Sequence, residues 1–297
     1  MLMLNTVATA NNKARPKRKS ELVAIFQRLS KNPSAISGFI VAAVLILMAV
    51  FAPIIAPYPY DQQDLYNTRQ APSLEHFFGT DELGRDVFSR VVYGSRYSLT
   101  IGFLAVLFSS GAGMVLGAIA GYFGGVVDDL IMRIIDVIQS IPGILLAISI
   151  SVVLGPGFFN TLLALSFGMI TMATRLTRAA VFGVRHQEFL EAATSINART
   201  PRIIFRHVIP NSFAPLLVSA TMSIGGVIMN AAALSFIGLG IQPPIPEWGA
   251  MISGGRTLIR SCPWMVTYPG IFIMLAVLSL NMFGDGLRDA LDPKLKK

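Results

Sequence analysis

Long stretches without charged residues alternate with short charged segments along the chain. A stretch of about 20 apolar residues is long enough to cross the roughly 30 Å hydrocarbon core of a membrane as an α-helix. By that measure the pattern predicts transmembrane helices within residues 38–55, 97–127, 137–174, 213–237 and 266–283. Residues 137–174 are too many for one crossing, and Gly155-Pro156-Gly157 near their middle predicts a tight turn between two helices. The pattern therefore predicts six crossings.

Two features inside the predicted helices bear on how they pack. Gly113, Gly117 and Gly121 recur every four residues, so they line one helix face that a neighbouring helix can approach closely. That neighbour is either another helix of this chain or a helix of a second protein. Pro142 predicts a kink near one end of the third helix, because proline removes a backbone donor and its ring clashes with the preceding turn.

The polar residues 61–96 separate the first two predicted helices and are expected on the outer side of the membrane. They carry acids and arginines close together in the chain. We expect Asp81, Arg85 and Asp86 to form local ion pairs rather than to bind a ligand.

Two tryptophans and three polar or polarisable residues are further candidates for specific positions. Trp248 and Trp264 are expected at the membrane–water interface, where tryptophan is enriched. Met222, Met229 and Asn230 lie on the fifth predicted helix, where they either line a pathway or pack against neighbouring helices.

The composition indicates a membrane protein rather than a nucleic-acid-binding one. Only 13% of the 297 residues are charged, 53% are hydrophobic, and the mean hydropathy is +0.62, whereas about 25% of the residues in a soluble domain are charged. The net charge of +8 lies in blocks between apolar runs. The basic residues 1–31 are expected in the cytoplasm, and six crossings return residues 287–297 to the same side.

The residues offer no chemistry for an enzyme or for an independent pump. Cys262 is the only cysteine and the three histidines are far apart, so neither a disulfide framework nor a metal site is expected. There is no GxxxxGK[ST] phosphate loop. The predicted helices hold no deep ionisable residue of the kind that ion-coupled carriers use. We therefore expect no cofactor in this chain and an energy source in another subunit.

One polar stretch, residues 185–211, lies between two long apolar runs, and we call it the knob. Its apolar residues recur at three- and four-residue spacing, which places them on one face of a short helix: Phe189, Leu190, Ala193 and Ile196. Asn197 suits a left-handed turn. Thr200 as N-cap and Pro201 at the first position then predict a second helix. We expect two short helices joined by a bend.

The knob resembles a known signature. Glu191-Ala192-Ala193, followed at the expected distance by Ile209-Pro210, is similar to the EAA loop of ABC-importer permeases, in which a cytoplasmic coupling helix sits in a groove of a separate ATPase. The family usually has glycine at the position of Asn197 and leucine at that of Ile209. The resemblance implies that six residues dock on an ATPase: Glu191, Ala192, Ala193, Asn197, Ile209 and Pro210.

Further motifs extend the resemblance over nearly all of the chain past residue 31. GTDELGRDVFSRVVYGSR (79–96), GYFGG (121–125), AALSFIGLGIQPP (232–244) and the carboxy-terminal GDGLRDALDPKLK (284–296) are similar to the C-type permeases of dipeptide, oligopeptide and nickel importers. The resemblance implies an all-α membrane protein with six transmembrane helices in the type I ABC importer permease fold, with a cytoplasmic coupling helix.

That family implies an organisation of the chain and a set of partners. We expect a cytoplasmic basic tail (1–31), a first transmembrane helix with an external segment (32–96), a permease domain (97–286) and a cytoplasmic tail (287–297). The expected partners are a homologous second permease, two ATPases that bind ATP and Mg²⁺, an external solute-binding protein and membrane lipid, without nucleic acid. The expected location is the bacterial inner membrane, with both termini in the cytoplasm.

The resemblance leaves the transported solute open. Importers of di- or oligopeptides, of glutathione and of nickel chelates share these motifs. A different class of protein, a membrane scaffold or sensor that partners an ATPase without transporting a solute, is the alternative to a permease. An ion-coupled carrier is a further rival, and its uptake would depend on an ion gradient rather than on ATP.

Overall fold

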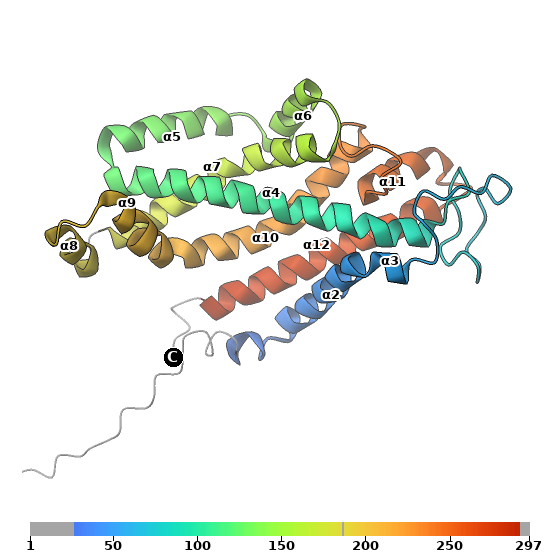
Figure 1. Ribbon diagram of the computed structural model, residues 1–297, viewed down its shortest axis with the longest axis horizontal. Coiled ribbons are helices and arrows are strands. Elements are labelled where there is room, and N and C mark those ends of the chain that lie inside the picture. The colour runs from blue at the N-terminus through green and yellow to red at the C-terminus, as the bar shows by residue number, and fades with distance from the viewer. Residues whose placement is uncertain (1–26, 186, 292–297) are drawn as a thin grey trace, which may run out of the picture.

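A computed structural model describes residues 27–185 and 187–291, and within them the regular structure is helical (Figure 1). The basic residues from Lys13 to Lys19 and the carboxy-terminal residues 292–297 lie outside the described residues. The elements in chain order are α2 (Pro33–Val50), α3 (Ala52–Ile55), α4 (Val87–Phe123), α5 (Gly125–Gln139), α6 (Gly143–Leu154), α7 (Phe158–Val184), α8 (Glu188–Ser195), α9 (Thr200–Ile203), the π-helix η1 (Ile204–Val208), α10 (Ile209–Phe236), α11 (Trp248–Gly255), the 3₁₀-helix η2 (Arg256–Leu258) and α12 (Trp264–Leu291).

The long helix α4 runs through the middle of the bundle and is flanked by α7, α10 and α2 (Figure 1). One buried apolar cluster joins α4 to α6, α7 and α10, with Ile101, Leu165 and Leu234 among its members. A second joins α2, α4, α11 and α12 around Trp248. The first residues of α2 and the last of α12 lie toward the end of the molecule that carries α8 and α9 (Figure 1). There, Arg28 donates a hydrogen bond to the Ala290 carbonyl at 3.4 Å.

The all-helical membrane architecture is confirmed, but the expected count of six crossings is not. Among the described residues, four helical segments are long and apolar enough to cross a membrane: 33–50, 87–123, 200–236 and 264–291. The bent pair α5–α6 makes a fifth if it counts as one span. The remaining long helix, α7, has 27 residues, among them Arg175 and Arg178, and does not belong to that group.

The helix that contains the second predicted crossing begins at Val87, before the uncharged stretch that starts at Tyr97. Asp86 provides the start signal: its carboxylate accepts a hydrogen bond from the backbone N–H of Ser89 at 2.7 Å and so caps the helix. The 37 residues of α4 span about 55 Å, far more than the hydrocarbon core, so its outer turns protrude. Arg90 and Arg96, expected in an external loop, therefore belong to this helix.

Pro142 does more than kink the third predicted helix. The chain turns by 84° between α5 and α6, and the break covers residues 140–142. Proline offers no backbone donor to the preceding turn and disfavours a helical conformation at the residue before it. With Gly143 immediately after it, the helix ends at Gln139 and restarts in a new direction.

The local ion pairs expected in the outer segment are confirmed. Arg85 Nε donates to Asp81 Oδ2 at 2.7 Å. Asp86, besides capping α4, lies 3.0 Å from the Nδ1 atom of His76, and both side chains are buried. These contacts tie the outer segment to the start of α4.

Trp248, expected at the membrane–water interface, does not face lipid or water. Its side chain is completely buried, and its indole N–H donates to the Val91 carbonyl at 2.9 Å. The preceding residue, Glu247, is also buried; it caps α11 through the Ala250 N–H at 2.9 Å and accepts from the Ser98 hydroxyl at 3.2 Å. Tryptophan at this position is therefore part of the core that holds α11 against α4. Trp264 is half-buried and donates to the Thr80 carbonyl at 3.1 Å.

The glycine face of α4 packs against α7 of the same chain. A Cβ atom on Gly113 would lie 2.4 Å from the Cβ atom of Ala173, and one on Gly117 would lie 2.3 Å from the Thr174 carbonyl oxygen. At Gly121 the nearest atom would be the Cβ atom of Val181, at 2.8 Å. The sequence left open whether the glycine face meets a helix of this chain or of a second protein. It meets α7 of this chain, and the three glycines let the two helix backbones touch.

We predict that Gly117→Leu disrupts the α4–α7 contact. The added side chain meets the backbone of α7, which cannot move aside as a flexible side chain would, so we expect a loss of at least about 1–3 kcal/mol of stability. The measurement is the midpoint of thermal aggregation of the detergent-solubilised protein, followed by size-exclusion chromatography.

Gly111→Ala is the matched control for that substitution. Gly111 lies on the same helix, and a Cβ atom there would have no neighbour within 4 Å. Because alanine favours helix over glycine by about 1 kcal/mol, this variant should be as stable as the parent or more so. Equal destabilisation by both variants would contradict the close contact.

Candidate functional site

The knob protrudes from one end of the bundle as two short helices, α8 and α9, joined by a bend (Figure 1). This is the arrangement that the sequence predicts. The knob follows directly on α7 and leads through η1 into α10, so it links two of the helices that pack on α4. His186, between α7 and α8, lies outside the described residues.

Asn197 forms the bend, and the predicted left-handed turn is confirmed. Its φ angle is +54°. The Ala198 N–H bonds to the Ala193 carbonyl at 3.2 Å and the Asn197 N–H to the Thr194 carbonyl at 2.9 Å. These two bonds form a Schellman motif, which ends α8 and satisfies two of its last carbonyls. Asparagine replaces the glycine usual at such a position because it tolerates this conformation better than other side chains.

One face of α8 is buried in the chain's own core. Leu190 and Ala193 are 3% and 6% exposed. They belong to a small apolar cluster whose other buried members are Ala118 of α4, Val181 of α7, and Ile203, Ile204 and Val208 of α9 and η1. The knob is therefore anchored to α4, to α7 and to the start of α10, rather than hanging from a flexible loop.

The opposite face of α8 is open. Glu188, Glu191, Ala192 and Ser195 are exposed, and their spacing puts them on the side away from Leu190 and Ala193. The expectation that Ile196 shares the buried face is wrong: it is 79% exposed, because α8 ends at Ser195 and the chain turns away. An exposed isoleucine beside the bend adds an apolar contact point, whereas the sequence pattern had put this residue on the same face as Leu190 and Ala193.

The six residues expected to dock on an ATPase fall into two groups. Glu191, Ala192, Asn197 and Pro210 are exposed. Ala193 is buried and Ile209 is half-buried against the same apolar cluster, so these two side chains contact the rest of the chain.

The second half of the knob differs in detail from the expectation. The N-cap of α9 is Arg199 rather than Thr200, and no side chain caps the helix. Pro201 is therefore the second helical residue rather than the first, and its missing N–H still costs nothing, because the N–H groups of the first turn have no partner within the helix. A π-helical turn, η1, then precedes Pro210. Since Pro210 cannot donate to the carbonyl four residues earlier, a regular α-helical ladder cannot continue through this point.

Ion pairs clamp α7, the helix that leads into the knob, to α5. Arg178 Nε and Nη2 donate to the two carboxylate oxygens of Asp128, each at 2.5 Å. One turn earlier Arg175 pairs with Asp136. A bidentate arginine–carboxylate pair fixes orientation as well as distance. The clamp fixes the orientation of α5 relative to α7.

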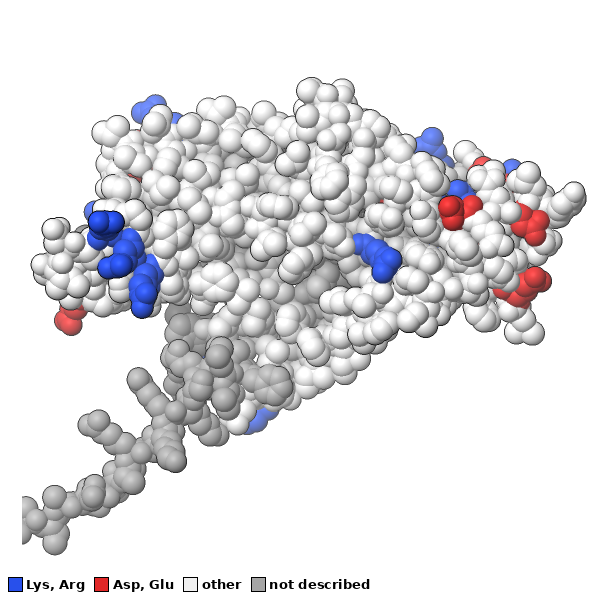
Figure 2. Space-filling view, viewed as in Figure 1, with Lys and Arg blue, Asp and Glu red and all other residues white. Residues whose placement is uncertain are grey.

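Charge is distributed unevenly between the two ends of the molecule. Figure 2 shows mainly Lys and Arg over the α8–α9 end, whereas most of the acidic side chains in view lie at the opposite end, together with further Lys and Arg. Arg199, Arg202 and Arg206 of the knob are exposed. Their charges suit either acidic groups of a partner or the anionic surface of the inner leaflet.

Asn230, Met229 and Met222 occupy different environments on α10. Asn230 and Met229 are exposed, whereas Met222 is half-buried and packs against Gly284 of α12. Among the described residues, no group of three or more His, Cys, Asp or Glu side chains is placed to hold a metal ion.

Two family models match the chain. The model described as binding-protein-dependent transport system inner membrane component matches residues 113–297. The model described as the N-terminal TM domain of oligopeptide transport permease C matches residues 20–72.

Curated relatives are similar over most of their length. The dipeptide transport system permease protein DppC of Alkalihalophilus pseudofirmus is 49% identical over 271 residues, which covers 91% of this chain and 89% of the relative. The di/tripeptide transport system permease protein DppC of Pseudomonas aeruginosa is 42% identical, with 93% of each chain covered. The glutathione transport system permease protein GsiD of Escherichia coli is 44% identical, covering 91% and 90%.

A solved structure shares the fold. An inward-facing form of the MetNI methionine ABC transporter matches with a TM-score of 0.54 at 17% identity, covering 69% of this chain and 98% of that one. The bundle and its knob thus define a helical membrane permease of the ABC-importer type. The chain belongs to the family of binding-protein-dependent transport system inner membrane components, as a C-type permease. It is a transport subunit rather than an enzyme.

We predict that the bend of the knob depends on a residue that tolerates positive φ. Asn197→Gly should preserve it, whereas Asn197→Val should strain it by about 1–2 kcal/mol, because valine disfavours the left-handed conformation. Hydrogen exchange at the Ala198 amide, which closes the Schellman motif, reports the difference. We expect faster exchange in the valine variant and little change in the glycine variant. Equal exchange in both would contradict this account of the turn.

Proposed function

We propose that this chain forms one half of the translocation pathway of an ATP-driven importer, and that the knob couples it to a separate ATPase. The observation that carries the proposal is that α8 is buried on one face and exposed on the other. Its inner face, Leu190 and Ala193, is locked into the apolar cluster with α4, α7 and η1. Its outer face, with Glu191 and Ala192, is free to contact a partner.

This arrangement suits the transmission of movement. A displacement of α8 by a partner is carried through Leu190 and Ala193 to Val181 and Ala118, which are packed at the ends of α7 and α4. The Arg178–Asp128 pair carries it on to α5. Closely packed interiors shift between discrete arrangements rather than deforming continuously. A rocking of α8 therefore becomes a movement of whole helices.

The proposed partners follow from this coupling role of the knob. We propose that the pathway lies between this chain and a homologous permease, that two ATPase subunits bind ATP and Mg²⁺, and that an external binding protein delivers the solute. The docking contact comprises Glu191, Ala192, Asn197 and Pro210, with Ile196 added because it is exposed beside the bend. Ala193 and Ile209 do not contact the partner; they pack against the rest of the chain and hold α8 and the start of α10 in place.

The two ends of the molecule lie on opposite sides of the membrane in this proposal. We propose that the knob and both termini lie in the cytoplasm of a bacterial cell, which suits the basic residues of the knob and of the amino-terminal tail. The acidic outer segment then meets the binding protein on the far side.

Di- or oligopeptides are the solutes that we propose. This rests on the relatives with 49% and 42% identity, which are a dipeptide and a di/tripeptide transport permease. Glutathione, itself a tripeptide, is the second candidate, because a glutathione permease is 44% identical. Nickel chelates are the third candidate, since nickel importers share the motifs that this chain resembles. A scaffold that transports nothing is the alternative from another class.

We predict that Glu191→Lys and Ala192→Trp uncouple the transporter. Both side chains lie on the outer face of α8, so the variants should insert and fold normally. They should lose most of the co-purifying ATPase and at least tenfold in ATP-driven uptake. Uptake into proteoliposomes and pull-down of the ATPase are the two measurements.

Glu82→Lys is the control for that experiment. It makes the same charge reversal at an exposed position of the outer segment, at the far end from the knob. ATPase binding should be unchanged in this variant. If Glu191→Lys and Ala192→Trp retain normal ATPase binding and uptake, the assignment of α8 as the docking helix is wrong.

We predict accumulation of a labelled dipeptide in proteoliposomes that contain the assembled transporter, its binding protein and internal ATP. Omission of ATP should abolish accumulation, whereas collapse of the ion gradients should leave it intact. Excess glutathione competes only if it is a substrate. Absence of any ATP-dependent accumulation with peptides, glutathione or nickel chelates would favour the scaffold.

A further inference from the structure

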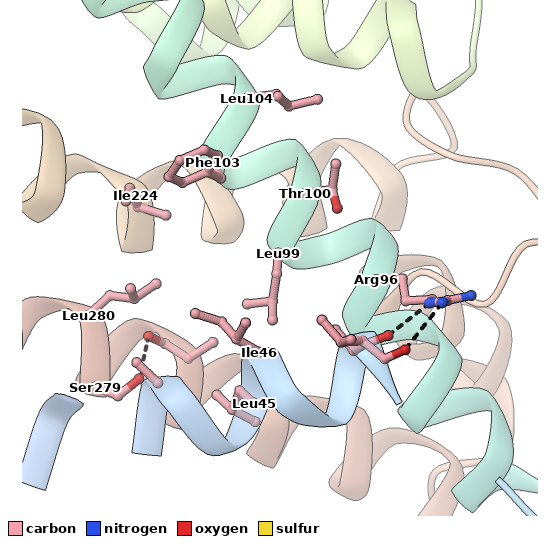
Figure 3. Close-up of a pocket in the computed structure, with 14 residues that line it drawn as sticks. Leu45, Ile46, Arg96, Leu99, Thr100, Phe103, Leu104, Ile224, Ser279 and Leu280 are labelled. Carbon is pink, nitrogen blue, oxygen red and sulfur yellow. Dashed lines mark hydrogen bonds between the residues drawn. The ribbon is translucent and has the colours of Figure 1, made fainter. Parts of the chain in front are cut away.

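A groove of about 570 Å³ lies between α2, α4, α10 and α12 (Figure 3). Apolar side chains form most of its wall, with Leu45, Ile46, Leu99 and Phe103 among them. A second cavity of about 230 Å³ shares Phe103 and Ile224 with the groove and extends between α4 and α10. Together they follow α4 from Arg96 to Met114, which is about 27 Å by helical rise.

Arg96 lies at one end of this groove, where it binds backbone carbonyls at the end of α2. Pro53 has no N–H, so the Ala49 carbonyl lacks the donor that a continuing helix would supply. Arg96 Nε donates to that carbonyl at 2.8 Å, and Nη2 donates to the Val50 carbonyl at 3.4 Å (Figure 3). The arginine thus caps a helix broken by proline.

The guanidinium has hydrogen-bonding capacity left over. Of its five N–H groups, two make these bonds, and the side chain is exposed. Among the ion pairs of the described residues, none joins Arg96 to a carboxylate. A permanent positive charge therefore lies at the rim of an apolar groove without an anion to balance it.

The depth of Arg96 identifies the kind of anion. It contacts the last residues of α2, whose 18 residues rise about 27 Å, close to the hydrocarbon thickness of a membrane. Arg96 therefore lies at the boundary between hydrocarbon and headgroups, at the end away from the knob. Ile46, Val50 and Phe103 on the walls are each more than half exposed, as lipid-facing side chains are.

We propose that this groove is a phospholipid site: the lipid phosphate pairs with Arg96, and one acyl chain lies in the groove along α4. The groove follows α4 over more than the roughly 15 Å depth of one leaflet, so it can hold a chain of that length. Charge complementarity at the rim and an apolar wall below it match the two parts of a phospholipid. This proposal does not depend on the solute or on the ATPase contact.

The test uses the assembled transporter in phosphatidylcholine vesicles that contain a small fraction of phosphatidylglycerol with a photoactivatable diazirine in one acyl chain. After irradiation, mass spectrometry locates the adducts. We expect adducts on Ile46, Leu99 and Phe103, and a loss of at least fivefold in Arg96→Gln. Arg260→Gln, an exposed arginine outside the groove, should leave the yield unchanged.

Two further arms separate a lipid site from a general effect on folding. Thr100→Trp fills the groove while keeping Arg96, and should lower the yield as much as Arg96→Gln. A diazirine-bearing fatty alcohol, which has no phosphate, should label the groove equally with arginine or glutamine at position 96. Phospholipid adducts that neither variant reduces would overturn the proposal. So would crosslinks from groove residues to a second permease instead of lipid.

Discussion

The backbone contact between α4 and α7 is the constraint on which the rest of the structure depends. Gly113, Gly117 and Gly121 leave no room for a side chain against α7, so the two helices lie against each other along several turns. Within a membrane, the hydrophobic effect does not drive helices together, and association relies on the close packing that small residues permit. The contact brings together the ends of α4 and α7 beside the knob, where Ala118 and Val181 pack against α8. The knob therefore has a rigid base.

Three prolines explain where the helices depart from simple rods. Pro53, Pro142 and Pro210 each lack a backbone N–H, so one hydrogen bond of the helical ladder is missing at each position. The structure accommodates the three breaks in different ways. Arg96 caps the carbonyl that Pro53 leaves open. At Pro142 the chain turns by 84°. Before Pro210 the helix adopts a π-turn. In a membrane, unsatisfied backbone groups are costly, so breaks of this kind lie where side chains or turns can satisfy them.

Two networks of polar contacts hold opposite ends of the bundle. At the knob end, Arg178 and Asp128 join α7 to α5. At the other end, buried Glu247 and Trp248 join α11 to α4 through Ser98 and Val91. The two ends are therefore each tied to α4 or to its close neighbour α7. Helices rather than loops therefore connect α8 to the opposite end of the bundle.

The sequence by itself determined the helical membrane class, the position of the knob and the left-handed bend at Asn197, because these follow from local composition and backbone preference. It did not predict that α4 begins before its uncharged stretch, since the helical turns that carry Arg90 and Arg96 show no apolar run. Only the tertiary structure decided that Ala193 and Trp248 are buried, that the glycines meet α7, and that Ile196 is open. Those facts depend on which surfaces meet, and residues far apart in the chain decide that.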